Sequence, residues 1–271
     1  MRDDLEIIKV RVPKADWVKV RAIGDIHFGS ILHQEKAWMD FRDSILKETN
    51  SYVLLLGDLI NNNTRGSTAG SPFEDQIRPR DQKRIMTEML KPLADKGMIL
   101  AAVSGNHEKR SLKDADDDPM YDIMCKLDLE DSYRENAAFI HLSIGERKSK
   151  GKTWAGTSYN IAMTHGSGGG VLTGSSVNKN ERFGYAFENI DVLITGHTHK
   201  GVITKPGKYV FNAAEGRMMF KPFVCISACS WMNYGGYALQ KMLIPASTAK
   251  DGEKLLYFSG DRHNKRIRTE W

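Results

Sequence analysis

Five short, mostly apolar runs along the chain each stop at a glycine or a polar side chain. They cover residues 18–23, 52–56, 98–103, 159–164 and 192–195. Apolar runs of this length are typical of strands covered on both faces, and a glycine at the end lets the backbone turn sharply. The pattern therefore predicts five buried strands, each followed by a turn.

Helical periodicity fills several of the gaps between these runs. Residues 34–47 and 80–96 carry apolar side chains at helical spacing, and residues 119–127 form a third candidate helix with Pro119 in its first turn. Pro92 lies inside the second helix and predicts a kink or an early end there. The alternation of strands and helices indicates an α/β protein.

The pattern changes after residue 200. Four short β-like runs cover residues 202–204, 209–211, 223–226 and 255–258, with turn residues between them. We expect residues 200–260 to supply mainly a second, antiparallel sheet, and residues 261–271 to form a basic tail. Since no linker or repeat interrupts the sequence, we expect a single domain over residues 1–271.

Composition removes several protein classes. The 271 residues are 41% hydrophobic and 27% charged, which is ordinary for a globular protein and excludes an intrinsically disordered chain. No apolar run approaches the roughly 18–20 residues of a membrane span, and the charged N-terminus lacks the apolar stretch of a signal peptide. Three cysteines without a paired spacing suit a reducing compartment. We therefore expect a cytoplasmic protein without a membrane partner.

The net charge is mildly basic. Lysine and arginine number 39, and aspartate and glutamate number 34, which leaves +5. A balance this small does not require nucleic acid as a partner, and an anionic small substrate is equally compatible with it. The chemistry has to be sought in individual residues.

Each of the five predicted strands is followed by a possible metal ligand. The segments are Gly24-Asp25-Ile26-His27, Gly57-Asp58, Gly105-Asn106-His107-Glu108, His165-Gly166 and Gly196-His197-Thr198-His199. Open α/β sheets bind small molecules and ions just outside the carboxyl ends of their strands. We therefore expect the five turns to converge on one place.

The candidate ligand set is chemically coherent. It consists of two aspartates, one asparagine and four histidines: Asp25, His27, Asp58, Asn106, His165, His197 and His199. Mixed oxygen and imidazole ligands suit Mn²⁺, Fe, Zn²⁺ or Co²⁺ better than Ca²⁺. Seven ligands exceed the needs of one tetrahedral ion and suit two ions that share a bridging carboxylate. Such a pair can hold both oxygens of an in-line displacement at phosphorus.

The order GDIH, GD, GNHE, H and GHTH, spread over residues 24–199, resembles the calcineurin-like metallophosphoesterase superfamily. The resemblance implies an α/β fold of two stacked β-sheets flanked by helices, in four layers. It also implies two divalent metal ions, for which we expect Mn²⁺, with Fe, Zn²⁺, Co²⁺ or Ni²⁺ as alternatives. The enzyme would be a dinuclear metal-dependent phosphoesterase that uses a metal-bridging hydroxide as its nucleophile.

The resemblance further implies a role for each residue. Asp25, His27 and His199 would hold the first metal, Asp58 would bridge the two metals, and Asn106, His165 and His197 would complete the second. His107 would be the catalytic histidine, which stabilises charge beside the scissile phosphate and protonates the leaving alkoxide as a general acid.

The second motif departs from one branch of the superfamily. The Ser/Thr protein phosphatases resemble GDxVDRG, whereas residues 57–63 read GDLINNN. Asn61 therefore replaces the acidic residue that orients the catalytic histidine, and Asn62 replaces a phosphate-binding arginine. The spacing D-x-H-x-G at residues 25–29 resembles the repair-nuclease and phosphodiesterase branches instead. We predict a phosphodiesterase acting on nucleic acid or a nucleotide, with a phosphomonoesterase or protein phosphatase as the alternative.

The sequence leaves the surroundings of the catalytic histidine open. Either Glu108 or Asn61 could orient His107, and the candidates for substrate binding are Asn62, Arg65 and Arg110. A hypothesis of another class is a nucleic-acid-binding accessory protein whose metal site is structural or regulatory. The intact ligand set argues against it, because a structural site needs neither open coordination nor a catalytic histidine.

Overall fold

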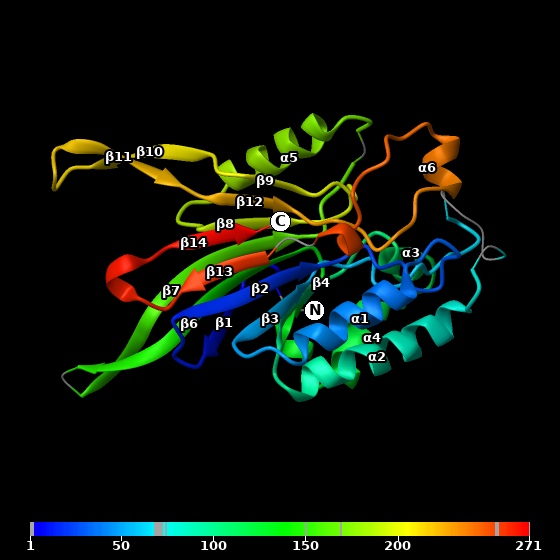
Figure 1. Ribbon diagram of the computed structural model, residues 1–271, viewed down its shortest axis with the longest axis horizontal. Coiled ribbons are helices and arrows are strands. Elements are labelled where there is room, and N and C mark those ends of the chain that lie inside the picture. The colour runs from blue at the N-terminus through cyan, green and yellow to red at the C-terminus, as the bar shows by residue number, and fades with distance from the viewer. Residues whose placement is uncertain are drawn as a thin grey trace.

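Two six-stranded sheets lie face to face at the centre of the protein (Figure 1). The computed structural model describes residues 3–67, 73, 75–149, 151–168, 170–252 and 255–270. The β2 sheet has the strand order β14-β13-β2-β3-β4-β5, and the β7 sheet has the order β1-β6-β7-β8-β12-β9. Helices cover the outer face of each sheet, so the predicted α/β fold of two stacked sheets flanked by helices is confirmed.

The strands are distributed over the two sheets and one hairpin. The β2 sheet contains β2 (Trp17–Ile23), β3 (Ser51–Leu55), β4 (Ile99–Val103), β5 (Tyr133–Arg134), β13 (Leu255–Ser259) and β14 (Ile267–Glu270). The β7 sheet contains β1 (Ile7–Val12), β6 (Ala137–Ser149), β7 (Lys152–Thr164), β8 (Val192–Thr195), β9 (Val202–Thr204) and β12 (Val224–Ser227). Strands β10 (Gly207–Asn212) and β11 (Arg217–Pro222) form a separate antiparallel hairpin.

The helices follow the strands of both sheets. They are α1 (Glu35–Ile45), α2 (Pro79–Asp95), α3 (Glu108–Ala115), α4 (Pro119–Lys126), α5 (Thr173–Tyr185) and α6 (Gly236–Gln240). Short 3-10 turns lie at Glu130–Ser132, Ala249–Asp251 and Arg262–Asn264. None of the helices in the described part of the chain combines the length and apolarity that crossing a membrane requires.

Side chains of the central strands alternate between two cores. On β3, Leu54 lies in the core between the sheets, whereas Val53 and Leu55 face the helices. Val20 of β2 and Ile161 of β7 belong to the same inter-sheet core as Leu54. The predicted runs are apolar on both faces because each face meets a different apolar layer.

The helices complete the two outer layers. Trp38 of α1, Leu90 of α2 and Met120 of α4 are fully buried against the β2 sheet. Phe183 of α5 packs against a buried cluster on the outer face of the β7 sheet that includes Leu193. Helix α2 continues through Pro92 to Asp95, so the proline does not end the helix early.

Parallel pairing brings the functional strand ends to one edge of the molecule. Strands β2, β3 and β4 pair in parallel in one sheet, and β7 and β8 pair in parallel in the other. These strands contain the five runs that the sequence predicts to end in metal ligands. Their carboxyl ends meet where the two sheets come together, at the right-hand end of the sheets in Figure 1.

The strands after residue 200 do not form one large sheet of their own, since only β10 and β11 pair separately and the others join the two central sheets. Strands β9 and β12 join the β7 sheet, with β12 parallel to β8, whereas β13 pairs with β2 in the other sheet. All four residues of β12 are buried, which suits an inner strand better than a half-exposed antiparallel one. Within the predicted basic tail, residues Ile267–Glu270 form β14 and pair with β13.

Neighbouring positions on β1 test the layer arrangement. We expect Ile8→Ala to lower the free energy of unfolding by about 2 kcal/mol or more, because Ile8 is 7% exposed and lies in the inter-sheet core. Ile7→Ala is the matched control: Ile7 is 55% exposed on the same strand, and its loss should stay within about 0.5 kcal/mol. Urea titration measures both variants, and equal losses would contradict the placement of β1.

Candidate metal centre

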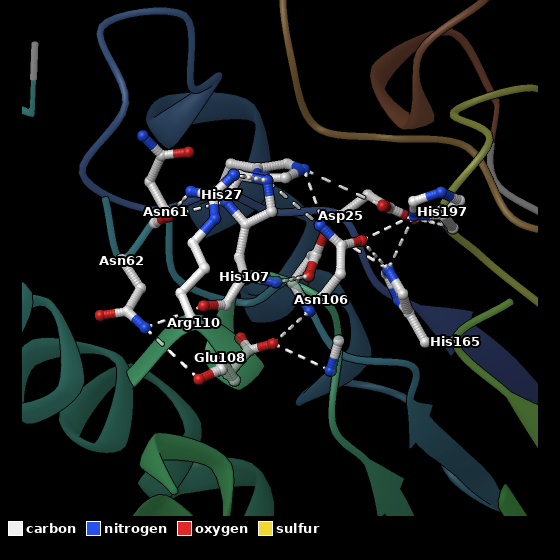
Figure 2. Close-up of polar contacts among 12 residues, drawn as sticks. Asp25, His27, Asn61, Asn62, Asn106, His107, Glu108, Arg110, His165 and His197 are labelled. Atoms are coloured by element: carbon white, nitrogen blue, oxygen red, sulfur yellow. Dashed lines mark hydrogen bonds and ion pairs between the residues drawn. The ribbon is translucent and has the colours of Figure 1, made fainter. Parts of the chain in front are cut away.

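Loops from both sheets bring the predicted ligands together (Figure 2). Asp25 and His27 follow β2, and Asp58 follows β3. Asn106 and His107 follow β4, His165 follows β7, and His197 and His199 follow β8. Three overlapping groups of these side chains have ligand atoms within 4.8 Å of one another: Asp25, His27 and His199; His27, Asp58 and His107; and Asp58, His165 and His197.

The first group surrounds a buried carboxylate. Nε2 of His27 lies 3.2 Å from Nε2 of His199, and the same His199 atom lies 3.2 Å from Oδ1 of Asp25. Nε2 of His27 lies 3.9 Å from that oxygen. Two imidazole nitrogens and a carboxylate oxygen therefore point at one small space.

The amide of Asn106 lies beside the group that Asp58, His165 and His197 form. Its Oδ1 lies 3.0 Å from Nε2 of His165 and 2.7 Å from Nδ1 of His197. These two ring nitrogens lie 3.3 Å apart. Nδ1 of His165 donates to the main-chain oxygen of Leu56 at 2.7 Å, which directs Nε2 into the site.

Asp58 lies between the two groups. Its Oδ2 is 3.8 Å from Nε2 of His27 and 3.3 Å from Nε2 of His165. Its Oδ1 accepts the main-chain N–H of His107 at 2.8 Å. One carboxylate oxygen therefore faces both groups, while the other holds the loop that carries the catalytic candidate.

The donor set fits divalent cations. Oδ1 of Asp25 is buried and has no properly directed hydrogen bond from any described residue, although Nε2 of His199 is close. Leaving such an oxygen without a donor is costly, and a bound cation removes the cost. Oxygen and imidazole atoms in two groups that share Asp58 indicate a dinuclear metal site.

The backbone of the ligand loops is held in an uncommon conformation. Asp25, His27, Asp58, His197 and His199 have positive φ angles of 51°, 50°, 50°, 68° and 56°. Residues other than glycine rarely adopt this left-handed region, and each such residue costs on the order of 1 kcal/mol. Such conformations cluster at functional sites, where surrounding contacts hold them in place.

Two glycines let the ligand loops cross closely. A side chain on Gly57 would collide with the main chain of Gly105, and one on Gly105 would collide with Asp58. Gly57 also has a φ of 82°. Any larger residue at either position would push the Asp58 loop away from the Asn106 loop.

Burial and neighbouring charges move the pKa values of these residues in opposite directions. Burial lowers the pKa of His27 well below its usual range, and the nearby His107 adds to this effect. Burial also opposes a charge on His165, but the Asp58 carboxylate outweighs it and raises the pKa of His165 to about 10. Although burial opposes it, His165 and His107 hold the pKa of Asp58 well below its usual range. A bound cation would compete with the proton that the Asp58 charge favours on His165.

Glu108 joins two ligand loops. Its carboxylate accepts the main-chain N–H groups of Asp58 and Leu59 at 2.8 Å, of Gly105 at 2.9 Å and of Ile60 at 3.3 Å. Burial and the Asp58 charge raise the pKa of Glu108 to about 7, while the N–H donors oppose this shift and favour the carboxylate. Glu108 therefore orients the loops rather than the His107 ring.

The orienting group of His107 is a main-chain carbonyl. Nδ1 of His107 donates to the carbonyl oxygen of Asn61 at 2.6 Å. Nε2 lies 3.0 Å from a guanidinium nitrogen of Arg110, and the ring stands edge-on to His27 with centroids 4.3 Å apart. Of the two residues that the sequence leaves open, Asn61 makes this contact, and it does so through its backbone.

The three substrate-binding candidates lie in different surroundings. Arg110 contacts His107 and also donates to the carbonyl of Asn61 at 3.0 Å. Arg65 is exposed on the loop that follows β3. Asn62 is 1% exposed, and its amide nitrogen donates to the carbonyl of His107 and to Oγ of Ser111, both at 2.8 Å. Asn62 thus ties its loop to the start of α3 and is not open to substrate.

Two further residues hold loops next to the ligand segments, and the sequence analysis missed both. Asp75 accepts the amide N–H groups of Asn61 at 2.6 Å and Asn63 at 2.7 Å, and lies in a polar loop that shows no pattern. Lys200 is 8% exposed and donates to the carbonyls of residues 170 and 171 at 2.6 and 2.8 Å. Only its position directly after the His197-Thr198-His199 motif could have pointed to Lys200.

Comparison with known proteins identifies a family. Residues 18–201, about two thirds of the chain, match the family model described as calcineurin-like phosphoesterase. The sequence matches none of the curated proteins.

Solved structures resemble the chain at low sequence identity. A metallophosphoesterase from Sphaerobacter thermophilus is 13% identical, with 94% of this chain and 89% of that chain covered and a TM-score of 0.40. A predicted phosphoesterase from Streptococcus pneumoniae is 11% identical, with 94% and 98% covered and a TM-score of 0.33. GAP50, the anchor in the inner membrane complex of Plasmodium, is 11% identical, with 94% and 84% covered and a TM-score of 0.41.

The role of Glu108 can be tested by replacing one carboxylate oxygen with an amide nitrogen. Glu108→Gln should lower the free energy of unfolding by about 2–4 kcal/mol and weaken Mn²⁺ binding at least about tenfold, because an amide nitrogen cannot accept the N–H groups it would face. The matched control is Glu88→Gln on α2, whose side chain is 62% exposed. Thermal unfolding and calorimetric Mn²⁺ titration report the two effects. Wild-type values for both would show that Glu108 does not join the loops.

Proposed function

The chain belongs to the calcineurin-like phosphoesterase family, and we propose that within this family it is a phosphodiesterase that acts on nucleic acid or nucleotides. The family and the His/Asp groups make it a metal-dependent phosphoesterase, whose substrates are phosphate esters. The observation that carries the finer proposal is the charge beside His107, where Arg110 supplies a guanidinium and position 62 is a buried amide.

We assign the metal ligands as the sequence predicts them. Asp25, His27 and His199 would hold one ion, Asn106, His165 and His197 the other, and Asp58 both. When bound, the ions supply the acidity that activates water and the positive charge that polarises the ester. The mixture of carboxylate, amide and imidazole donors suits Mn²⁺, which we propose as the ion.

His107 is placed to hold and deliver a proton. Because Nδ1 is tied to the carbonyl of Asn61, Nε2 is the ring nitrogen that faces the metal groups, 3.9 Å from Oδ2 of Asp58. The main-chain tether keeps the ring in this direction whether or not Nε2 carries a proton. A protonated Nε2 can then donate to the leaving oxygen as a general acid.

Arg110 is the residue that we assign to the phosphate. It donates to the carbonyl of Asn61 at 3.0 Å and to Oδ1 of Asn63 at 2.6 Å, which fixes its guanidinium beside His107. An anionic phosphate oxygen is a stronger acceptor than a neutral ring nitrogen. Substrate binding would therefore draw the guanidinium towards the phosphate and release Nε2 of His107.

The charge at this side of the site favours a diester. A phosphomonoester carries close to two negative charges at neutral pH, and the protein phosphatase branch places an arginine at the position of Asn62. Here the Asn62 amide is buried and holds helix α3, so it adds no charge. A diester carries one negative charge, which Arg110 can hold together with the metal ions.

Metal removal tests the activity and its substrate class together. Exhaustive chelation should abolish hydrolysis of bis-p-nitrophenyl phosphate, and added Mn²⁺ should restore it, because the buried donor groups need cations. With Mn²⁺ present, kcat/KM should be higher for this diester than for p-nitrophenyl phosphate. Activity that survives chelation would contradict a metal-dependent enzyme, and a preference for the monoester would make the protein a phosphomonoesterase.

A second pair of variants tests the proton donor. His107→Ala should lower kcat by about 100- to 10,000-fold, the range expected for loss of a general acid, while the bound metal content stays unchanged. His141→Ala is the control, since His141 lies on β6 and contacts Asn160. Turnover of bis-p-nitrophenyl phosphate and elemental analysis measure the two properties. Wild-type turnover in His107→Ala would refute the assignment.

A further inference from the structure

The β10–β11 hairpin carries an aromatic face. Strand pairing places Tyr209 opposite Phe220 and Phe211 opposite Met218, so the four side chains lie on the same face. In that order they are 68%, 54%, 82% and 50% exposed. Exposed apolar side chains that are grouped in this way mark an interaction site rather than ordinary surface.

The opposite face of the hairpin is used within the protein. Lys208 donates to the carbonyl of Phe187 at 2.8 Å, and Lys221 donates to Oδ1 of Asn189 at 3.3 Å. These contacts hold the hairpin against the segment that follows α5. Figure 1 shows the hairpin extending to the left, away from the metal-centre edge of the two sheets.

A cleft of about 280 Å³ opens at the base of the aromatic face. Pro222, the last residue of β11, lies on that face by its register and also lines the cleft. Three cationic side chains line the cleft as well: Lys205, Lys265 and Arg266. The acidic residue in the wall, Asp191, lies 3.0 Å from Lys265 and is already paired.

The positive charge of the chain is concentrated in the two segments that meet at this cleft. Residues 205–222 contain four basic residues and one acidic residue, a net of +3, and residues 262–268 contain four basic residues, a net of +4. Together they hold +7, whereas the whole chain holds +5, so all other residues have a net charge of −2. Of these basic residues, Lys205, Lys265 and Arg266 line the cleft itself, so this surface favours an anionic partner.

We propose that the hairpin surface, defined as the aromatic face with Lys205 and Arg266, binds single-stranded nucleic acid. Bases would stack on Tyr209 and Phe211, and phosphates would lie in the basic cleft. A single strand can offer both its bases and its phosphates to one surface, whereas a duplex keeps its bases stacked inside. A second copy of the chain would bring the Lys205 and Arg266 charges of two molecules together, which disfavours self-association through this face.

The hairpin surface is separate from the metal centre. Strand β9 begins three residues after His199, and β9 and β10 lead the chain away from the ligand loops. None of the metal-ligand candidates contributes to the surface. The inference therefore stands independently of the proposed phosphodiesterase activity, and an oligonucleotide can be bound here while another part of the same strand is free.

Binding can be measured without turnover. We would titrate a fluorescein-labelled oligothymidylate with the full chain in EDTA at low salt and follow fluorescence anisotropy. Tyr209→Ala and Phe211→Ala should each weaken binding roughly 5- to 100-fold, as expected for loss of a stacked base. Lys205→Ala should make the dependence of log affinity on log salt shallower by about 0.7, because one phosphate contact is lost.

Matched controls separate this surface from general effects. Tyr237→Ala removes an aromatic side chain that is 48% exposed on α6, and Lys91→Ala removes one charge from α2. Both should bind as the wild type does. Phe211→Ala with Mn²⁺ should hydrolyse bis-p-nitrophenyl phosphate at the wild-type rate, so a failure of the metal centre would be seen separately.

Several results would overturn the proposal. One is a wild-type protein that does not bind the oligothymidylate at low salt, and another is unchanged affinity in both aromatic variants. Equally tight binding of a duplex would contradict recognition through unstacked bases. If Phe211→Ala instead converts a dimer into a monomer in sedimentation velocity and binds the oligonucleotide normally, the hairpin is a self-association surface.

Discussion

The structure depends on a buried cluster of carboxylates, imidazole nitrogens and an amide oxygen, all of which can bind a cation. Asp25 and Asp58 are 0% and 2% exposed, and ring nitrogens of four histidines and the amide oxygen of Asn106 point at the same space. Buried carboxylates in an interior of low dielectric constant repel one another and need positive charge beside them. The left-handed backbone at five of these positions adds a further cost. Bound cations would offset both costs.

The rest of the fold holds the loops that carry this cluster in fixed positions. Neither sheet alone contains the site, since Asp25 and Asp58 come from one sheet and His165 and His197 from the other. The apolar core between the sheets sets their separation, and the carboxylate of Glu108 clamps the main chain of two ligand loops. Glycines at positions 57 and 105 allow these loops to cross. Core packing, the hydrogen bonds of Glu108 and the two glycines therefore together bring five loops from two sheets to one place.

The sequence predicted what local rules control. Apolar runs located β2, β3, β4, β7 and β8, because a strand covered on both faces has to be apolar on both faces. It could not predict that strands after residue 200 divide between two sheets, since partner choice depends on contacts far apart in the chain. The surroundings of His107 show the same limit. A missing acidic side chain at Asn61 was visible in the sequence, but a main-chain carbonyl at that position has no sequence signature.

By itself, the sequence determined the class of the fold, the family and the identity of the candidate ligands, because these are carried by residue types at short spacing beside strands. Only the tertiary structure decided that Asp58 faces both ligand groups, that Glu108 holds loops rather than His107, and that Asn62 is buried. It also decided that Pro222 at the end of the aromatic hairpin and Arg266 of the basic tail line one cleft. The physical reason is the same in each case. The packing of the two sheets sets the distances between groups that are far apart in sequence. Whether a side chain or a main-chain carbonyl becomes the hydrogen-bond partner of a residue depends on those distances.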